Sequence, residues 1–308
     1  MDESSKTSAP APSNRLGLPG RILVLVVMAQ LLAAVALLQR AIDERFGEYR
    51  ATEEVLYIEN GEVLKKVLLG FDSLAADIYW LRTVQYFGGQ RLYSTEKRFE
   101  LLEPLLNITT TLDPKLKIVY TYGATFLSES WPLGAGVPLK ALALIDKGIE
   151  NNPDHWRFYL DKGFIYFWTM KDYQRAAEIF LEGSKLPGAP YWMVGTAGRT
   201  LTRGGDRETA RELWKILHDT AENEQMRGNA EIHLQQLDAL DQIDVLTQIA
   251  LKLKERSGHF PESWEELIAA GYLRGVPADP TGVPYLLNAQ TEKAEVSRES
   301  SIAGMPVR

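Results

Sequence analysis

The chain has 308 residues, of which 45% are hydrophobic and 24% are charged, a balance typical of globular proteins with about two domains. Its net charge of -7 argues against nucleic acid as the main partner, because phosphate binding requires a basic face. It contains no cysteine, which excludes disulfides, thiol catalysis and thiolate metal sites.

The chain begins with a polar tail and an apolar run. Residues 1–18 are rich in Ser, Pro and Ala and lack the apolar side chains that would repay the entropy of ordering, so we predict a disordered tail. Residues 22–38 carry no charge and one polar side chain, Gln30, and a helix of that length spans about 25 Å, close to the thickness of a bilayer core. We predict a single transmembrane anchor over residues 19–40.

Two other readings of the apolar run are a buried core helix and a cleaved signal peptide, for which residues 34–36 offer a small-residue site. The run continues past that site, which disfavours cleavage. Three basic residues precede the run and three follow it, so the positive-inside rule does not decide the orientation. The acidic residues after the run favour an amino terminus inside, which in a bacterium would place the bulk of the chain in the periplasm at the inner membrane.

Residues 41–71 are predicted to form a linker with a short extended piece and a helix. Asn60-Gly61 lies between two apolar stretches, which is typical of a β-hairpin turn. The apolar residues that follow recur at helical spacing, however, so a turn and then a helix is the expected order.

Asp77 is embedded in the apolar segment over residues 74–87. It has two readings: a proton-handling group, or a structural carboxylate that accepts hydrogen bonds. The second is favoured, because a buried charge must find donors.

The clearest pattern of the chain lies between Trp156 and Pro187. Large, small and helix-stopping residues alternate there at fixed spacing: Tyr159, Lys162, Gly163, Tyr166, Ala176, Phe180 and Pro187. This pattern resembles the tetratricopeptide repeat, a unit of about 34 residues in two helices, with Lys162 as a departure at a position that is usually Leu. Gly163 and Ala176 would let the two helices approach closely, and Pro187 would end the second helix.

The same spacing recurs on both sides. Gly163 and Gly198 are 35 residues apart, and Ala176 and Ala210 are 34 apart. Upstream, Gly123 and Ala141 are separated by 18 residues where the other units use 12 or 13, and a Gly- and Pro-rich loop over residues 131–138 absorbs the difference. A weaker unit precedes these. We predict an all-α fold, with a tetratricopeptide-like solenoid over residues 72–225.

Stacked repeats of this family curve into a superhelix lined by the first helix of each pair, so the resemblance implies a binding groove. Its predicted lining is Lys117, Tyr120, Leu127, Arg157, Leu160, Phe164, Phe167, Trp192 and Arg199. Aromatic and Arg side chains often anchor interfaces, which favours a peptide or helix with an apolar face and an acidic group. Leu160 and Phe164 depart from the Lys and Asn of repeats that clamp a terminal carboxylate. The alternative is that this aromatic stripe is core.

Residues 226–257 carry apolar residues every three or four positions, so we predict two amphipathic helices that cap the array. Ser257-Gly258 would end them, and a short helix would follow Pro261. Residues 298–308 are predicted to be a disordered tail.

A turn signature lies near the carboxyl end. Asp279-Pro280, Gly282 and Pro284-Tyr285 are similar to the Asp-Pro-x-Gly-x-Pro-Tyr region of type II secretion major pseudopilins, and the likeness spans residues 258–297. Those proteins bind calcium through downstream acidic residues, of which this chain offers Glu292 and Glu295. The plainer reading is a turn that precedes a terminal strand pair.

We find no catalytic motif and expect neither an enzyme nor a cofactor. The four histidines occur singly, and no phosphate-binding loop, nucleophile elbow or dinucleotide fingerprint is present. The favoured function is a membrane-tethered scaffold for other proteins, in a secretion, pilus or envelope-assembly complex. The alternatives are an enzyme or enzyme subunit with a site near Asp77, and a purely structural spacer.

Overall fold

The structure is a computed structural model that describes residues 18–46 and 60–304. The chain divides into two compact units, Met1–Val55 and Leu56–Arg308. Helices make up most of the described residues, and the sheet found among them has two short strands. The fold is therefore all-α, as the sequence predicts. Residues 1–17 of the predicted tail and residues 47–59 of the predicted linker lie outside the described residues.

The described part of the first unit is one helix, α1, which runs from Leu18 to Phe46. Its described side chains are exposed, and Leu32, for example, is 66% exposed. Among the residues that the structure describes in full, no helix is both long enough and apolar enough to cross a membrane.

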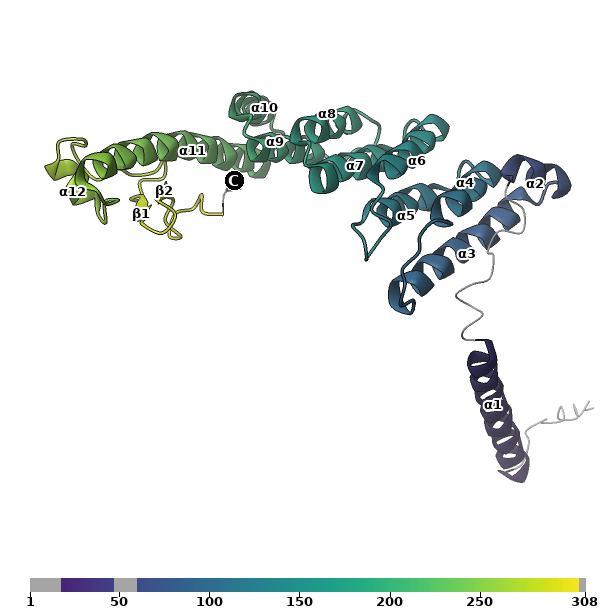
Figure 1. Cartoon of the computed structure of the whole chain (residues 1–308). Coiled ribbons are helices and arrows are strands. Elements are labelled where there is room, and N and C mark those ends of the chain that lie inside the picture. The colour runs from purple at the N-terminus through teal and green to yellow at the C-terminus, as the bar shows by residue number, and fades with distance from the viewer. Residues whose placement is uncertain (1–17, 47–59, 305–308) are drawn as a thin grey trace, which may run out of the picture. The chain divides into compact units, whose positions relative to one another are not determined.

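In the second unit, each helix from α3 to α11 packs against the next one along the chain (Figure 1). The helices are α2 (Gly61–Val67), α3 (Asp72–Leu92), α4 (Leu102–Leu112), α5 (Lys117–Ser128), α6 (Pro138–Asn151), α7 (Trp156–Phe164), a π-helix (Ile165–Met170), α8 (Tyr173–Ser184), α9 (Trp192–Gly204), α10 (Arg207–Asp219) and α11 (Glu224–Ser257). The connections between them are short, so consecutive helices form hairpins.

The three glycines that define the sequence repeat lie where helices meet. A Cβ atom on Gly163 of α7 would overlap the ring of Phe180 on α8, and a Cβ on Gly198 of α9 would lie 2.8 Å from the indole of Trp214 on α10. Gly123 of α5 is closed in by leucine side chains from α4 and α6. A larger residue at these positions would push neighbouring helices apart.

The turns between the two helices of a pair also repeat. In each, a residue with positive φ directly precedes the N-cap of the second helix, and the spacing is 35 and then 34 residues. The positive-φ residues are Gly136 (67°), Lys171 (58°) and Gly205 (87°), and the N-caps are Val137, Asp172 and Asp206. Backbone conformation thus carries the same period as the glycines.

The buried side chains form three clusters. The first joins α3 to α7 around Tyr120 and Phe158, and the second joins α7 to α11 around Phe180 and Trp214. The third lies between the second half of α11 and the carboxyl-terminal segment. Each helix therefore shares its core with its sequence neighbours, as in a stack of repeats.

One long helix follows the last pair, where the sequence led us to expect two. α11 spans 34 residues without a break, and Gly258, with φ 82°, ends it. The segment contains neither a proline nor a buried glycine that would require a kink, so the two-helix prediction is wrong. The first half of α11 packs on α10, and Arg207 and Arg211 of α10 pair with aspartates near the middle of α11.

The carboxyl-terminal segment folds against the second half of α11. It contains α12 (Trp264–Ala269) and an antiparallel pair, β1 (Leu286–Asn288) and β2 (Lys293–Glu295). The Asp279 carboxylate accepts hydrogen bonds from the backbone N–H groups of Thr281 and Val283, at 2.8 and 3.1 Å. This is the turn that the plainer reading predicted before a strand pair. Tyr285 is buried, and its hydroxyl donates to Gln242 of α11 at 2.7 Å.

Two further predictions concern local structure. The helix expected after Asn60-Gly61 is α2, and Asn60 caps it rather than forming a hairpin turn, because its side chain accepts from the N–H groups of Glu62 and Val63 at 3.0 and 3.3 Å. Residues 298–304, predicted as part of a disordered tail, are ordered against the third cluster, where Ile302 is 0% exposed.

Candidate binding surface

The nine predicted groove residues fall into two groups. Tyr120, Leu127 and Leu160 are between 0 and 3% exposed and belong to the core. The prediction that they line an accessible groove is therefore wrong. The helices that carry them, α5 and α7, each pack on the preceding and on the following helix. Two sides of each helix are therefore buried, whereas the groove prediction assumed that one of these sides is open.

The other six lie at or near the surface of the first helices. Lys117, Arg157 and Arg199 are exposed, Trp192 is 43% exposed and Phe164 is 36% exposed. Phe167 is half-buried. The structure brings some of these to aromatic neighbours: Trp192 meets Trp156 edge to face at 6.4 Å, and Phe164 meets Phe180 in the same way at 5.2 Å.

Phe167 lies in a cluster that we call the aromatic-cationic patch: Phe167, Trp168, Lys171, Tyr173 and Arg203. The Phe167 ring meets Trp168 at 4.7 Å and Tyr173 at 5.3 Å, both edge to face. The Arg203 guanidinium lies 5.4 Å from the centre of the Phe167 ring and 5.9 Å from that of Trp168. Lys171 Nζ lies 5.8 Å from the Trp168 ring. Trp168 remains 57% exposed, so the patch offers a large aromatic side chain held between two cations.

The π-helix presents this patch. Gly163 and Ala176 are 13 residues apart, whereas the equivalent Gly198 and Ala210 are 12 apart. A π-turn absorbs one additional residue, and Ile165–Met170 lies within the longer interval. Phe167 and Trp168 of the patch lie within this π-helix. π-turns are frequent at functional sites.

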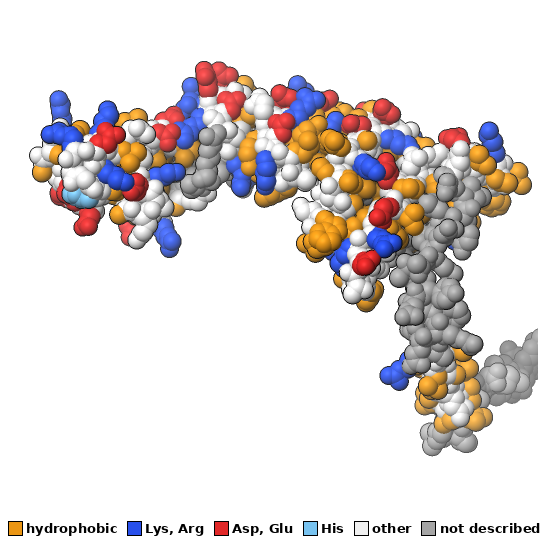
Figure 2. Space-filling model, in the orientation of Figure 1, with side chains coloured by type: hydrophobic (Ala, Val, Ile, Leu, Met, Phe, Trp, Pro, Cys, Tyr) orange, Lys and Arg blue, Asp and Glu red, His pale blue; other side chains and the backbone are white. Residues whose placement is uncertain are grey.

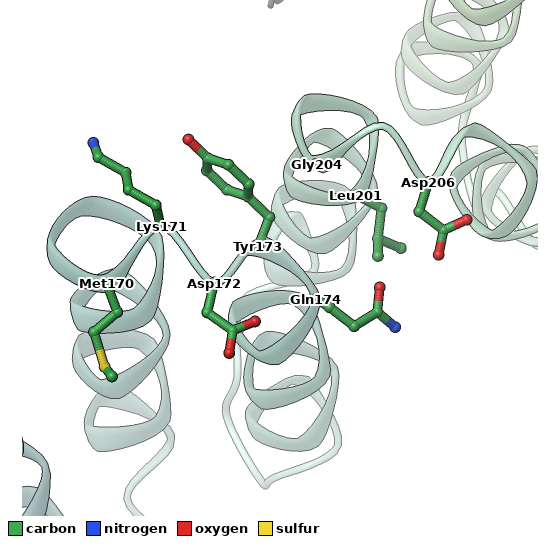
Figure 3. A pocket seen from close by; sticks show the side chains of 8 residues that line it. All are labelled: Met170, Lys171, Asp172, Tyr173, Gln174, Leu201, Gly204 and Asp206. Carbon is green, nitrogen blue, oxygen red and sulfur yellow. The ribbon is translucent and has the colours of Figure 1, made fainter.

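An open cavity of about 420 Å³ adjoins the patch (Figure 3). Its walls come from the end of the π-helix, the start of α8, the end of α9 and the turn before α10: Met170, Lys171, Asp172, Tyr173, Gln174, Leu201, Gly204 and Asp206. Asp172 and Asp206 cap α8 and α10 by accepting from the N–H groups of Arg175 and Thr209. Both carboxylates keep their negative charge, so the cavity wall is acidic where the neighbouring patch carries the cations Lys171 and Arg203.

A second group of charges lies nearer the first repeat. Burial lowers the pKa of His155, and the nearby cations Lys117 and Arg157 lower it further. Arg157 donates to Asp161 at 3.1 Å. Burial raises the pKa of Asp161, with Thr121 and Arg157 acting in the other direction. The predicted groove residues Lys117 and Arg157 therefore share one neighbourhood and give it positive charge.

The described residues offer little sign of catalytic chemistry. Asp77 is exposed on α3. It is therefore neither a buried proton-handling group nor a buried structural carboxylate, the two roles that the sequence suggested for it. No group of three or more His, Cys, Asp or Glu side chains within the described ranges is placed to hold a metal. Glu292 and Glu295 are engaged by Lys254 and by Asn288.

Comparison with known proteins does not assign a role to this surface. No protein-family model matches the chain, and no curated protein is significantly similar to it. On the face shown in Figure 2, basic and acidic side chains alternate without a large field of one sign. Specific recognition would then come from local clusters such as the aromatic-cationic patch.

Proposed function

We propose that this chain is a membrane-tethered scaffold of tetratricopeptide type that binds another protein on the first helices of its stacked pairs. Three observations support the repeat assignment: the nesting of Gly163 and Gly198 against large rings, the 34- to 35-residue period of the turns, and the packing of each helix on the next. Such stacks present extended surfaces suited to binding.

The aromatic-cationic patch is the observation that carries the binding proposal. Trp168 is the kind of side chain that anchors interfaces, since it buries a large area at low entropic cost. Arg203 and Lys171 flank it and attract an acidic group. The partner is therefore a peptide or helix with an apolar or aromatic face and a neighbouring carboxylate.

A peptide selection tests this directly. Peptides selected on the immobilised full chain should be enriched in sequences that combine an aromatic or aliphatic anchor with Asp or Glu. Trp168→Ala and Arg203→Ala should each weaken binding of such a peptide by about 10-fold or more, because truncation of an interface anchor costs at least 1–2 kcal/mol. Binding should also weaken with added salt.

Glu178→Ala, on the exposed side of α8, provides the control, since it changes a charge outside the patch. If the selected peptides bind Trp168→Ala and the original chain equally, the patch is not the binding site. Retention of the wild-type thermal transition in each variant would exclude unfolding as the cause of a loss.

The tether is proposed from the uncharged run over residues 22–38. The full chain should stay in the membrane pellet at alkaline pH, and Leu31→Arg with Leu32→Arg should release it, because each Arg at the centre of a span costs about 2.5–3.5 kcal/mol. Recovery of the unsubstituted chain in the supernatant would contradict the tether.

The orientation of the chain across the membrane is proposed from the residues that flank the same segment. An amino terminus inside places the carboxyl end in the periplasm of a bacterium, so a reporter that is active only there should be active when fused after Arg308. A reporter active only in the cytoplasm would reverse the orientation. The pseudopilin-like turn at Asp279 is the reason for placing the scaffold in a secretion, pilus or envelope-assembly complex.

A further inference from the structure

The first helix of the stack exposes an apolar stripe. Along α3, Leu74, Ile78, Leu81 and Leu92 are between 46 and 68% exposed, although the opposite face of the helix packs on α4. A repeat stack normally ends in a polar face, because its terminal helix has no further neighbour. An apolar stripe at that position indicates a surface that another element covers.

The stripe follows a heptad pattern. Its members recur at alternating steps of four and three residues, like the a and d positions of a coiled coil: Leu74, Ile78, Leu81, Gln85, Gly88 and Leu92. A Cβ atom placed on Gly88 would meet no atom within 4 Å. Gly88 is thus a gap in the stripe that faces open space.

The stripe on α3 is complementary to the same stripe on a second, antiparallel copy of the helix. When two copies of α3 are placed antiparallel about a point between Leu81 and Gln85, Leu74 lies opposite Leu92, and Ile78 lies opposite Gly88. The β-branched side chain of the stripe then faces its gap, which is the knob-and-hole complement that close helix packing requires. An interface between identical copies must be self-complementary in this way.

One of the two rows of residues beside the stripe obeys the same symmetry. Asp77, Val84 and Arg91 form one flanking row at seven-residue spacing. In the antiparallel arrangement, Val84 faces its own copy near the two-fold axis, and Asp77 faces Arg91. Arg91 already donates to Glu129 of its own chain but retains further N–H groups. Unlike charges thus meet at both ends of the contact.

We propose that a second copy of this chain covers α3, with the two α3 helices antiparallel across a two-fold axis. The binding surface on α7 to α9 plays no part in this contact, so the inference stands independently of the proposed scaffold function. It also gives Asp77 a role, as a charge that selects the antiparallel direction.

Cysteine crosslinking tests the direction of the pairing. The natural chain has no cysteine, so introduced thiols report on one contact each. In the full-length protein, Leu74→Cys and Leu92→Cys should each give little crosslinked dimer when introduced alone, because antiparallel pairing holds the two copies of each residue about 27 Å apart. The chain that carries both substitutions should crosslink readily. Dimer from either single variant, or none from the double variant, would overturn the proposal.

A substitution at the gap tests the packing. Gly88→Leu in the double-cysteine chain should lower the dimer yield at least 10-fold, because the new side chain occupies the space that Ile78 of the second copy requires. Folding of the chain itself should not suffer, since Leu is a better helix former than Gly. Gly228→Leu is the matched control: Gly228 also lies within a helix with nothing within 4 Å, and its substitution should leave the yield unchanged. Equal yields from the two variants would contradict the interface.

A fluorophore distinguishes other occupants of the stripe. A bimane group on Leu81→Cys in proteoliposomes should be shielded from both an aqueous quencher and brominated lipid if a second copy covers α3. Quenching by brominated lipid would assign the stripe to the bilayer surface, and quenching by iodide alone would show that nothing covers it; either result overturns the proposal.

Discussion

Gly163 shows at the residue scale how this chain builds a stack. The Phe180 ring occupies the space where a Cβ atom of residue 163 would lie. The helices α7 and α8 can therefore pack this closely only because Gly163 has a hydrogen atom in place of a side chain. Gly148 and Gly183, which sequence reasoning did not single out, do the same on the second helices. Gly148 meets Phe158 of the next pair, and Gly183 meets Met193. Each pair therefore nests within itself and against its successor.

Gly163→Ala should destabilise the chain by about 1–3 kcal/mol, because the methyl group forces the Phe180 ring or α7 to move. Gly228→Ala should be neutral or stabilising by up to about 1 kcal/mol, since it adds helix propensity at an open position. Chemical denaturation of both variants checks the difference. Equal stability would mean that α7 and α8 do not pack as closely as described.

His233 should make stability depend on pH. It stacks on Trp214 at 4.1 Å, and burial lowers its pKa, with the Gln236 hydrogen bond opposing and Arg199 adding to the decrease. The unfolded chain therefore takes up a proton at a higher pH than the folded chain. Stability is fully present above the unfolded pKa of about 6.5 and is lost as the pH falls below it.

The measurement is the free energy of unfolding at pH 7.5 and 5.5. His233→Phe keeps an aromatic ring on Trp214 and removes the titrating group, so its loss of stability between these two pH values should be smaller than that of the natural chain. His218→Phe, at the end of α10, controls for the substitution itself. An unchanged pH dependence in His233→Phe would contradict this account.

At the scale of elements, the π-helix explains an irregularity visible in the sequence. The sequence shows that the interval between Gly163 and Ala176 is 13 residues, one more than in the next unit. It does not show where the additional residue is accommodated, because one residue can either extend a loop or widen a turn of helix. The structure places it in Ile165–Met170, a π-helix that contains the exposed Trp168. Sequence reasoning therefore found Phe167 and missed its neighbours Trp168 and Arg203.

Asp172 and Asp206 are equivalent caps, 34 residues apart, on α8 and α10. Each accepts from a backbone N–H that would otherwise be unsatisfied. Asp172→Ala and Asp206→Ala should each cost about 1 kcal/mol in a denaturation experiment. Asp172→Asn and Asp206→Asn, which keep the accepting oxygen, should cost much less. A loss in the Asn variants equal to that in the Ala variants would refute the capping role.

The elements divide into those that local pattern determines and those that packing determines. Gly258 and the spacing of apolar residues fixed the end of α11, and Asp279 with Gly282 predicted the turn before the strands. Local pattern left open whether Tyr120 and Leu160 line a groove or lie in the core, because their burial depends on how many neighbours each first helix has. The order of residues 298–304 depends on the hydrophobic cluster beside α11 to which Ile302 belongs.

At the scale of the whole molecule, the second unit has three cores that neighbouring helices share. The third is the most separate, since it joins the second half of α11 to the terminal segment. Ile302→Ala should remove about 2–4 kcal/mol from that core. Because contacts in a stack run between neighbours, hydrogen exchange should increase in α12, β1 and β2 and change little in α5 to α8. A uniform increase along the unit would show that it unfolds as one body.

The central claim is that the aromatic-cationic patch is where this chain meets another protein. A photoreactive phenylalanine analogue at position 168, in the full chain expressed in its native cell, tests it most directly, with position 178 on α8 as the matched control. We predict an adduct of one defined mass from position 168, none from position 178, and loss of the adduct when Arg203→Glu reverses the flanking charge. Adducts that form equally at both positions, or that survive Arg203→Glu, would contradict the account.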